Sequence, residues 1–285
     1  MPQTIIDLLN KGVDANHADK FRQGNLIRLP AEGSLIATGD IHGHRRNFER
    51  IVAFAALSNN PNRHLVLQEI IHGGPEDPEG GCLSYKLLFD VVRYKLSFPD
   101  RIHIIMGNHD IAFINDSEVI KNGKEMNRSI WAALEGEFQQ KSADVKLAIK
   151  KYLFSQPLAV RCDNRIWLSH SLPSDRSADK FDLQVLSRPL KHSDVVKPGS
   201  GYLLIWGRKH SQNLLDKIAG LLDIDIFILG HQAQGQGWTR GGQNLIIIAS
   251  DHNHGCLLPI ELTEYYTVEE LVESIVPLAS IGAGA

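Results

Sequence analysis

The sequence predicts a fold of the α+β or α/β class, because short apolar runs alternate with amphipathic helical patterns through its first half. The second half is richer in strand-like runs, which one helical pattern interrupts. No internal repeat, low-complexity stretch or Pro/Gly linker divides the 285 residues. We therefore expect a single domain over residues 1–285.

Three apolar runs in the first half predict buried strands, at 34–40, 64–70 and 102–108. The two segments between them, 47–57 and 86–96, place apolar residues at helical spacing. This strand–helix–strand order favours parallel pairing. Residues 127–154 are then expected to be mostly helical.

The second half predicts six strands and one helix, which carries Leu214, Leu215, Ile218 and Leu222 on one face. The strands are expected at 158–163, 165–171, 202–207, 225–231, 244–250 and 255–262. Residues 1–33 are expected to form an N-terminal helical extension. Residues 263–285 are expected to form a C-terminal helix with a loose tail.

Composition narrows the range of partners. A formal net charge of -3 gives no reason to expect a nucleic-acid partner, since such domains carry a basic excess. No segment is apolar enough to span a bilayer, and the N-terminus does not have the pattern of a signal peptide. The three cysteines are widely spaced and form no CxxC pair, which fits a reducing compartment. A cytoplasmic protein without membrane partners is therefore expected, and its oligomeric state stays open.

Strand after predicted strand ends in a side chain that can bind a metal ion. In open α/β sheets ligands gather at the carboxyl ends of strands, so residues far apart in the sequence can meet there. Carboxylate oxygens and imidazole nitrogens together suit a borderline divalent ion. Asp40 and His42 are two residues apart, so in an extended strand end they point the same way. The whole set is Asp40, His42, Glu69, Asn108, His109, His170 and His231.

Five motifs carry a resemblance to the calcineurin-like metallophosphoesterases: GDIHGH (39–44), GNHD (107–110), LSHSLP (168–173), GHQ (230–232) and ASDHNHG (249–255). Within this family the chain is most similar to the phosphoprotein phosphatase group, over about 35–262. The resemblance implies a four-layer fold, in which helices flank a central β-sandwich. It also implies two divalent ions, which are Mn, Fe or Zn in the family.

The resemblance further implies a role for each matching residue. Asp40 and His42 would hold the first ion, and Glu69 stands where the family has a bridging aspartate. Asn108, His170 and His231 would bind the second ion, and Asn108 would also contact the substrate. His109 matches the general acid that protonates the leaving oxygen. Its neighbour Asp110 is a further catalytic candidate.

One segment departs from the family pattern. Where the group has GD-x-x-DRG, this chain reads QEIIHGG (68–74). Gln68 replaces a glycine and Glu69 replaces the bridging aspartate. His72 stands in place of the acid that orients the catalytic histidine, and Gly73 in place of a phosphate-binding arginine. If Glu69 does not bridge the ions, Glu76 or Asp77 would have to.

The missing arginine needs a substitute, because an arginine fork can bind two phosphate oxygens at once. Arg208, after the predicted strand 202–207, is the first candidate. The weaker candidates are Arg45, Arg46, Arg128 and Arg176. Asp251, His252 and His254 are expected either to orient metal ligands by hydrogen bonds or to form an ordinary polar loop.

Together these features predict a phosphoesterase that hydrolyses phosphomonoesters, on a phosphoprotein or a small molecule, by direct attack of a metal-bound hydroxide. Two alternatives remain open at this stage. One is a hydrolase of bis-nucleoside polyphosphates, and the other is an inactive relative that acts as a binding protein. Substrate choice is expected to reside in the loops 73–81 and 114–127.

Overall fold

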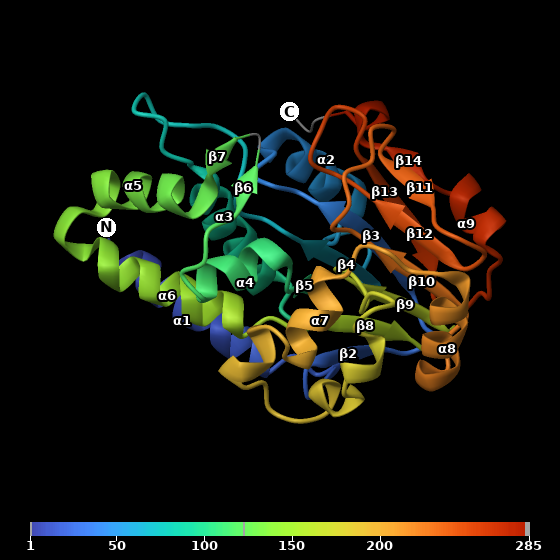
Figure 1. Ribbon diagram of the computed structural model, residues 1–285. Coiled ribbons are helices and arrows are strands. Elements are labelled where there is room, and N and C mark those ends of the chain that lie inside the picture. Colours follow the sequence, from blue (N-terminus) through green and yellow to red (C-terminus); the bar gives the residue numbers. More distant parts are fainter. Residues whose placement is uncertain (1, 122, 283–285) are drawn as a thin grey trace.

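A computed structural model describes residues 2–121 and 123–282 of the chain. It contains two large sheets and a small hairpin, and Figure 1 shows helices on both sides of the strands. The five-stranded sheet runs β14 (Val276–Pro277), β13 (Cys256–Glu261), β3 (Ser34–Asp40), β4 (Arg63–Gln68) and β5 (Ile102–Ile105). The seven-stranded sheet runs β1 (Arg22–Gln23), β2 (Leu26–Leu29), β8 (Ala159–Cys162), β9 (Ile166–Ser169), β10 (Ile226–Leu229), β12 (Leu245–Ile248) and β11 (Trp238–Arg240).

The two sheets pack face to face, because successive side chains of a strand point to opposite faces. Leu35 and Ala37 of β3 share one buried apolar cluster with Ile226 and Ile228 of β10. Ile36, between the first two, belongs instead to the cluster that contains the helices. One sheet face therefore lines the inner core and the other receives helices.

Helices cover both outer faces and complete the layers. α1 (Pro2–His17), α2 (Arg45–Ala55), α3 (Ser84–Ser97), α4 (Asn108–Ile114), α5 (Met126–Phe138) and α6 (Ser142–Phe154) precede the strands of the second half. α7 (Ser200–Trp206), α8 (Gln212–Leu222) and α9 (Val268–Glu273) follow β9 and β13. The predicted fold, a β-sandwich flanked by helices, is confirmed.

Parallel pairing of the first three predicted strands is also confirmed. β3 pairs with β4 and β4 with β5, both in parallel register. On the other sheet β9, β10 and β12 are parallel as well. The polar residues that follow these strands consequently emerge at one edge of each sheet, which creates the conditions for a shared site.

Two predicted elements are wrong. Residues 202–207 were expected to form a strand, but 202–206 belong to helix α7, which ends before Gly207. Tyr202 stacks on Trp206, four residues later, at 5.4 Å between ring centroids, which is a helical spacing. A short apolar run has no periodicity that distinguishes a buried strand from a buried helix.

The second wrong element is the N-terminal extension, which is not helical throughout. After α1, residues 22–29 contribute β1 and β2 to the seven-stranded sheet, where β2 pairs with β8. At the other end α9 is followed by β14 and by a short 3₁₀ turn, Leu278–Ser280. The last part of the expected loose tail, 283–285, lies outside the described residues. No helix in the described ranges is long and apolar enough to cross a membrane.

Candidate metal centre

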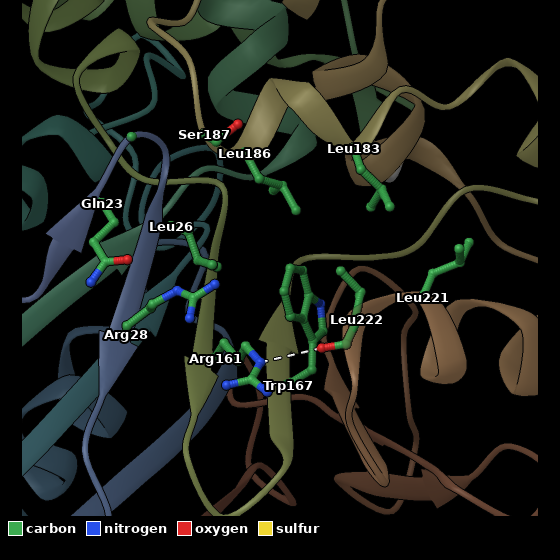
Figure 2. A pocket seen from close by; sticks show the side chains of 11 residues that line it. Gln23, Leu26, Arg28, Arg161, Trp167, Leu183, Leu186, Ser187, Leu221 and Leu222 are labelled. Atoms are coloured by element: carbon green, nitrogen blue, oxygen red, sulfur yellow. Dashed lines mark hydrogen bonds between the residues drawn. The ribbon is translucent and has the colours of Figure 1, made fainter.

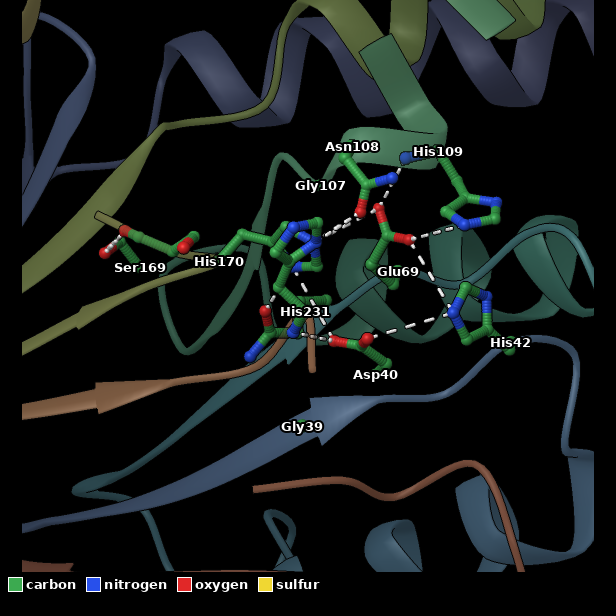
Figure 3. A network of polar contacts seen from close by, with 12 residues as sticks. Gly39, Asp40, His42, Glu69, Gly107, Asn108, His109, Ser169, His170 and His231 are labelled. Carbon is green, nitrogen blue, oxygen red and sulfur yellow. Dashed lines mark hydrogen bonds and ion pairs between the residues drawn. The ribbon is translucent and has the colours of Figure 1, made fainter. Parts of the chain in front are cut away.

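Seven side chains from separate parts of the sequence converge at the carboxyl ends of the strands (Figure 3). Asp40 ends β3, and Glu69 and His170 directly follow β4 and β9. The other four are His42, Asn108, His109 and His231. Figure 3 shows Glu69 between His42 and His109 on one side and His170 and His231 on the other. The structure therefore brings together all seven residues that the sequence singled out.

The convergence of Asp40 and His42 has a different cause from the one expected. β3 ends at Asp40, and His42 has a left-handed backbone with φ 44°, so the pair is not extended. The Nε2 atom of His42 still lies 3.8 Å from Asp40 Oδ2 and 3.8 Å from Glu69 Oε2. The turn, rather than strand alternation, brings the two side chains together.

Glu69 is the shared member of the site. Its side chain is fully buried, and its Oε1 accepts a hydrogen bond from His109 N at 2.9 Å. Its Oε2 has no hydrogen-bond partner among the described residues. Two groups of atoms that could ligate an ion contain this carboxylate, namely His42–Glu69–His109 and Asp40–Glu69–His170. A buried acceptor left without a donor is costly, so a cation between the groups would satisfy it.

Hydrogen bonds fix which nitrogen of each imidazole faces the site. His42 Nδ1 lies 2.9 Å from Ile71 O, which can only accept, so Nδ1 carries the proton and Nε2 offers its lone pair. Gln68 Nε2 donates to Thr38 O, which leaves Gln68 Oε1 to accept from His170 Nδ1 at 2.8 Å. His170 Nε2 is therefore also unprotonated and faces the site. Such oriented lone pairs are typical of metal ligands.

Asn108, His170 and His231 form the second side of the centre. Asn108 Oδ1 lies 2.9 Å from His170 Nε2 and 2.6 Å from His231 Nδ1, and the two nitrogens are 3.1 Å apart. Atoms bound at about 2.1 Å to one ion lie roughly 3.0–3.4 Å from one another. The 3.1 Å separation falls in this range and the 2.6 Å and 2.9 Å separations lie below it, so the closeness of one oxygen and two nitrogen donors, more than their spacing, fits a divalent ion.

The electrostatics of the site also favour cations. Burial raises the pKa of Asp40 to about 7, although a hydrogen bond from His231 N acts in the opposite direction and lowers that pKa. Burial, followed by the charges of Asp110 and Asp40, raises the pKa of Glu69 well above its usual range. Burial lowers the pKa of His42 to about 4 and that of His231 to about 3. Neutral imidazoles beside destabilised carboxylates are the state that a bound cation would stabilise.

These shifts predict that ion uptake releases protons in acidic solution. Near pH 6 the Asp40 carboxyl, with a pKa of about 7, holds a proton that an ion must displace, whereas the imidazoles are already neutral. Affinity should therefore fall as the pH drops through 7. Calorimetry in two buffers of different ionisation enthalpy should show more protons released near pH 6 than at about pH 8.5. Equal release at the two pH values would contradict this assignment.

His109 stands beside a second histidine. His109 Nδ1 lies 2.9 Å from His72 Nδ1, and its Nε2 lies 4.0 Å from Glu69 Oε2. His72 is fully buried and does not line the cavity. Burial, followed by the charge of His42, lowers the pKa of His72 to about 3, so it is neutral. His72 therefore occupies the place expected of the orienting acid, without the negative charge.

Asp110 takes a different place from the other candidates. Its Oδ2 accepts from Gly107 N at 2.9 Å and caps α4, and Asp110 does not line the cavity. A substrate contact by Asp110, which the catalytic prediction would require, is thus not supported. Instead it positions the helix that carries Asn108 and His109. Gly107 is needed here because a Cβ at that position would collide with Glu69 Oε1.

A cavity of about 520 Å³ opens over the centre and contains one of the candidate arginines. Arg208 lines it and donates to His231 O at 3.3 Å. Arg45 pairs with Asp90, and Arg128 with Glu125, outside the cavity. The remaining candidates, Arg46 and Arg176, are also absent from its lining.

The structure gives no support to Glu76 or Asp77, the alternatives named in case Glu69 does not bridge the ions. Glu76 pairs with Lys124 at 2.6 Å, and Asp77 Oδ1 accepts backbone hydrogen bonds within its own loop. Neither belongs to a group of ligand atoms in the described part of the chain. From the ASDHNHG segment Ala249 and Asp251 line the cavity, and neither His252 nor His254 does.

A second cavity, of about 320 Å³, shares no lining residue with the first (Figure 2). Its wall is apolar at Leu26, Leu186 and Leu222, and Arg161 Nε donates to Leu222 O at 3.2 Å. None of its lining residues belongs to a candidate metal group. The chemistry of the described residues is therefore concentrated in the first cavity.

Sequence reasoning missed two contributors to the site. Gln68 was noted only as a replaced glycine, but it orients His170. Lys121, inside the loop 114–127, lines the cavity and donates to Asp251 Oδ2 at 3.2 Å. The glutamine at position 68 was a usable signal, since a glutamine at a strand end can form a hydrogen bond with a histidine. Nothing in the local sequence distinguished Lys121 from a surface lysine.

The family to which the sequence can be matched agrees with this geometry. Residues 33–235 match the model of the calcineurin-like phosphoesterase family. The chain therefore belongs to this family of hydrolases, whose members use divalent metal ions. The resemblance to this family that the motifs predicted is confirmed, and the serine/threonine-protein phosphatases among its curated relatives support the placement near the phosphoprotein phosphatases.

Two curated relatives are serine/threonine-protein phosphatases. One, from Caenorhabditis elegans, is 22% identical over 77% of this chain and 47% of its own length. The other, phosphatase T of Trypanosoma brucei brucei, is 24% identical over 61% of this chain and 32% of its own length. The chain thus spans less than half the length of each.

Solved structures confirm the fold. A serine/threonine phosphatase from Saccharomyces cerevisiae superposes with a TM-score of 0.63, 14% identity and coverage of 91% of this chain and 82% of that one. A cold-active protein-tyrosine phosphatase from a Shewanella species gives 0.60 and 14%, over 83% and 77% of the two chains. At these identities the likeness concerns the fold alone.

Proposed function

We propose that the chain is a phosphomonoesterase that uses two divalent ions, of the manganese, iron or zinc type. One observation carries the proposal, namely that the buried Glu69 carboxylate is common to two separate groups of ligand atoms. Asp40 and His42 would hold one ion, and Asn108, His170 and His231 the other. When bound, two such ions polarise the phosphate and make a nucleophile of water at neutral pH.

The residues of the chain would then bind and orient the ester. Arg208, anchored by His231 O, would contact the phosphate oxygens in the cavity. Asn108 would contribute its amide to the same group. These contacts hold the phosphorus in one position while the leaving oxygen faces His109.

His109 would supply the proton that the leaving oxygen needs. Its Nδ1 is held by His72, so Nε2 is the atom that faces the reacting centre. A positioned general acid contributes about 10²–10⁴-fold. His72 acts through His109 and is a positioning residue.

A metal-dependence assay tests the proposal. Metal-free protein should not hydrolyse p-nitrophenyl phosphate, and added manganese should restore turnover better than magnesium, because imidazole-rich sites suit later transition ions. Phosphate release is measured with each ion and again after a chelator. Full turnover in the metal-free protein would rule the mechanism out, and no turnover with any of the ions would indicate an inactive relative.

A further inference from the structure

A hairpin contributes part of the lining of the cavity over the metal centre, including one lysine. Strands β6 (Ile120–Lys121) and β7 (Lys124–Glu125) pair antiparallel, with Lys121 opposite Lys124. Lys121 lines the same cavity as Asp40, His42 and His109, whereas Lys124 does not. The hairpin therefore presents one of its two paired lysines to the reacting groups.

The positive charge of Lys121 acts on the centre. After burial and the neighbouring imidazoles His42 and His72, Lys121 is the next cause that lowers the pKa of His109. It is also the largest cause after burial that lowers the pKa of His42. Lys121 lines the same cavity as both imidazoles, so its ammonium group lies within electrostatic reach of a ligand bound there.

The ion pair between Lys121 and Asp251 is weak enough for another anion to replace Asp251. Its Nζ lies 3.2 Å from Asp251 Oδ2, with side chains 28% and 23% exposed. A partly solvated ion pair of this kind contributes little stability, about 0–1 kcal/mol. A phosphate dianion, with more charge than one carboxylate, can compete with Asp251 for the ammonium group.

Few positively charged side chains line the cavity. Among the described residues, Arg208 is the one arginine that lines the cavity, and Lys121 is the one lysine. We propose that Lys121 binds an oxygen of the substrate phosphate, and that Asp251 holds the ammonium group until substrate arrives. This inference rests on the proposed function and names a residue for its substrate.

A purely structural role for the same ion pair makes the opposite prediction. If Lys121 and Asp251 only fasten the hairpin to the loop after β12, removing either partner weakens the site equally. If Lys121 binds phosphate, removing its charge weakens phosphate binding, whereas removing Asp251 eliminates a competitor. The two single variants therefore separate the roles.

The experiment measures binding of inorganic phosphate to the manganese-loaded protein by calorimetry, with metal content determined in parallel. Lys121→Met should weaken phosphate binding about 10-fold or more, since a hydrogen bond to a charged group is lost. Asp251→Asn should bind at least as tightly as the unchanged protein. Lys121→Arg, which keeps the charge, should bind more tightly than Lys121→Met.

Lys124→Met is the matched control, because Lys124 lies on the same hairpin as Lys121 but pairs with Glu76 of another loop and does not line the cavity. It should bind phosphate as the unchanged protein does, and all variants should keep their metal. Unaltered binding in Lys121→Met, or weakened binding in Asp251→Asn, would overturn the inference. Because binding is measured without turnover, absence of ester hydrolysis would refute the proposed function alone.

Discussion

Glu69→Gln is expected to lose at least one metal ion and nearly all turnover. The substitution keeps the size of the side chain and removes the negative charge that lies between the two ligand groups. That charge offsets the repulsion between two cations, so no neutral side chain can replace it. Metal content and hydrolysis of p-nitrophenyl phosphate are measured on the same preparation.

Two further variants define what the loss means. Glu69→Asp keeps the charge but shortens the reach, so it should bind metal and lose about 10²-fold in turnover through misplacement by about 1 Å. Glu76→Gln is the control, because Glu76 is a half-exposed acid that pairs with Lys124 away from the ligand groups. This variant should keep both ions. Unchanged metal content and turnover in Glu69→Gln would show that Glu69 does not bridge the ions.

His109→Ala is expected to keep both ions and to lose about 10²–10⁴-fold in turnover with an alkyl ester, whose leaving oxygen needs a proton. The loss should shrink with an activated aryl ester. The distinction matters because the ring also lies within reach of His42 and Glu69, so ligation is the competing role. Rates for both esters and metal content together separate the two roles.

The control for this series is His192→Ala, an exposed histidine outside the cavity, which should retain full turnover. His72→Ala should shift the pH profile of turnover rather than the metal content, since the His72 ring lies beside the Nδ1 of His109 and belongs to neither candidate metal group. Loss of an ion in His109→Ala, or equal losses with both esters, would assign His109 to the metal instead.

The candidate site was predictable because its ligands stand in motifs with fixed places at strand ends. GDIHGH and GNHD each combine a buried strand with oxygen and nitrogen donors, and parallel pairing then brings the motifs together. The alternation of apolar runs predicted the mixed class of the fold and the parallel pairing, whereas the β-sandwich was implied by the family resemblance. These features depend on local patterns that the sequence displays directly.

The parts that were not predictable depend on contacts between distant segments. Lys121 is defined by its reach to Asp251, 130 residues away, and no local pattern encodes that pairing. Gln68 acquires its role only when β4 places it beside His170, 102 residues later. Helix α7 was missed because an apolar run of its length fits a strand equally well.

Anomalous diffraction from crystals grown with manganese tests the central claim most directly. The account predicts two ion peaks about 3.5–4 Å apart, one beside His42 and one beside His170, with the Glu69 carboxylate between them. A single peak, or two peaks of which neither contacts Glu69, would contradict it.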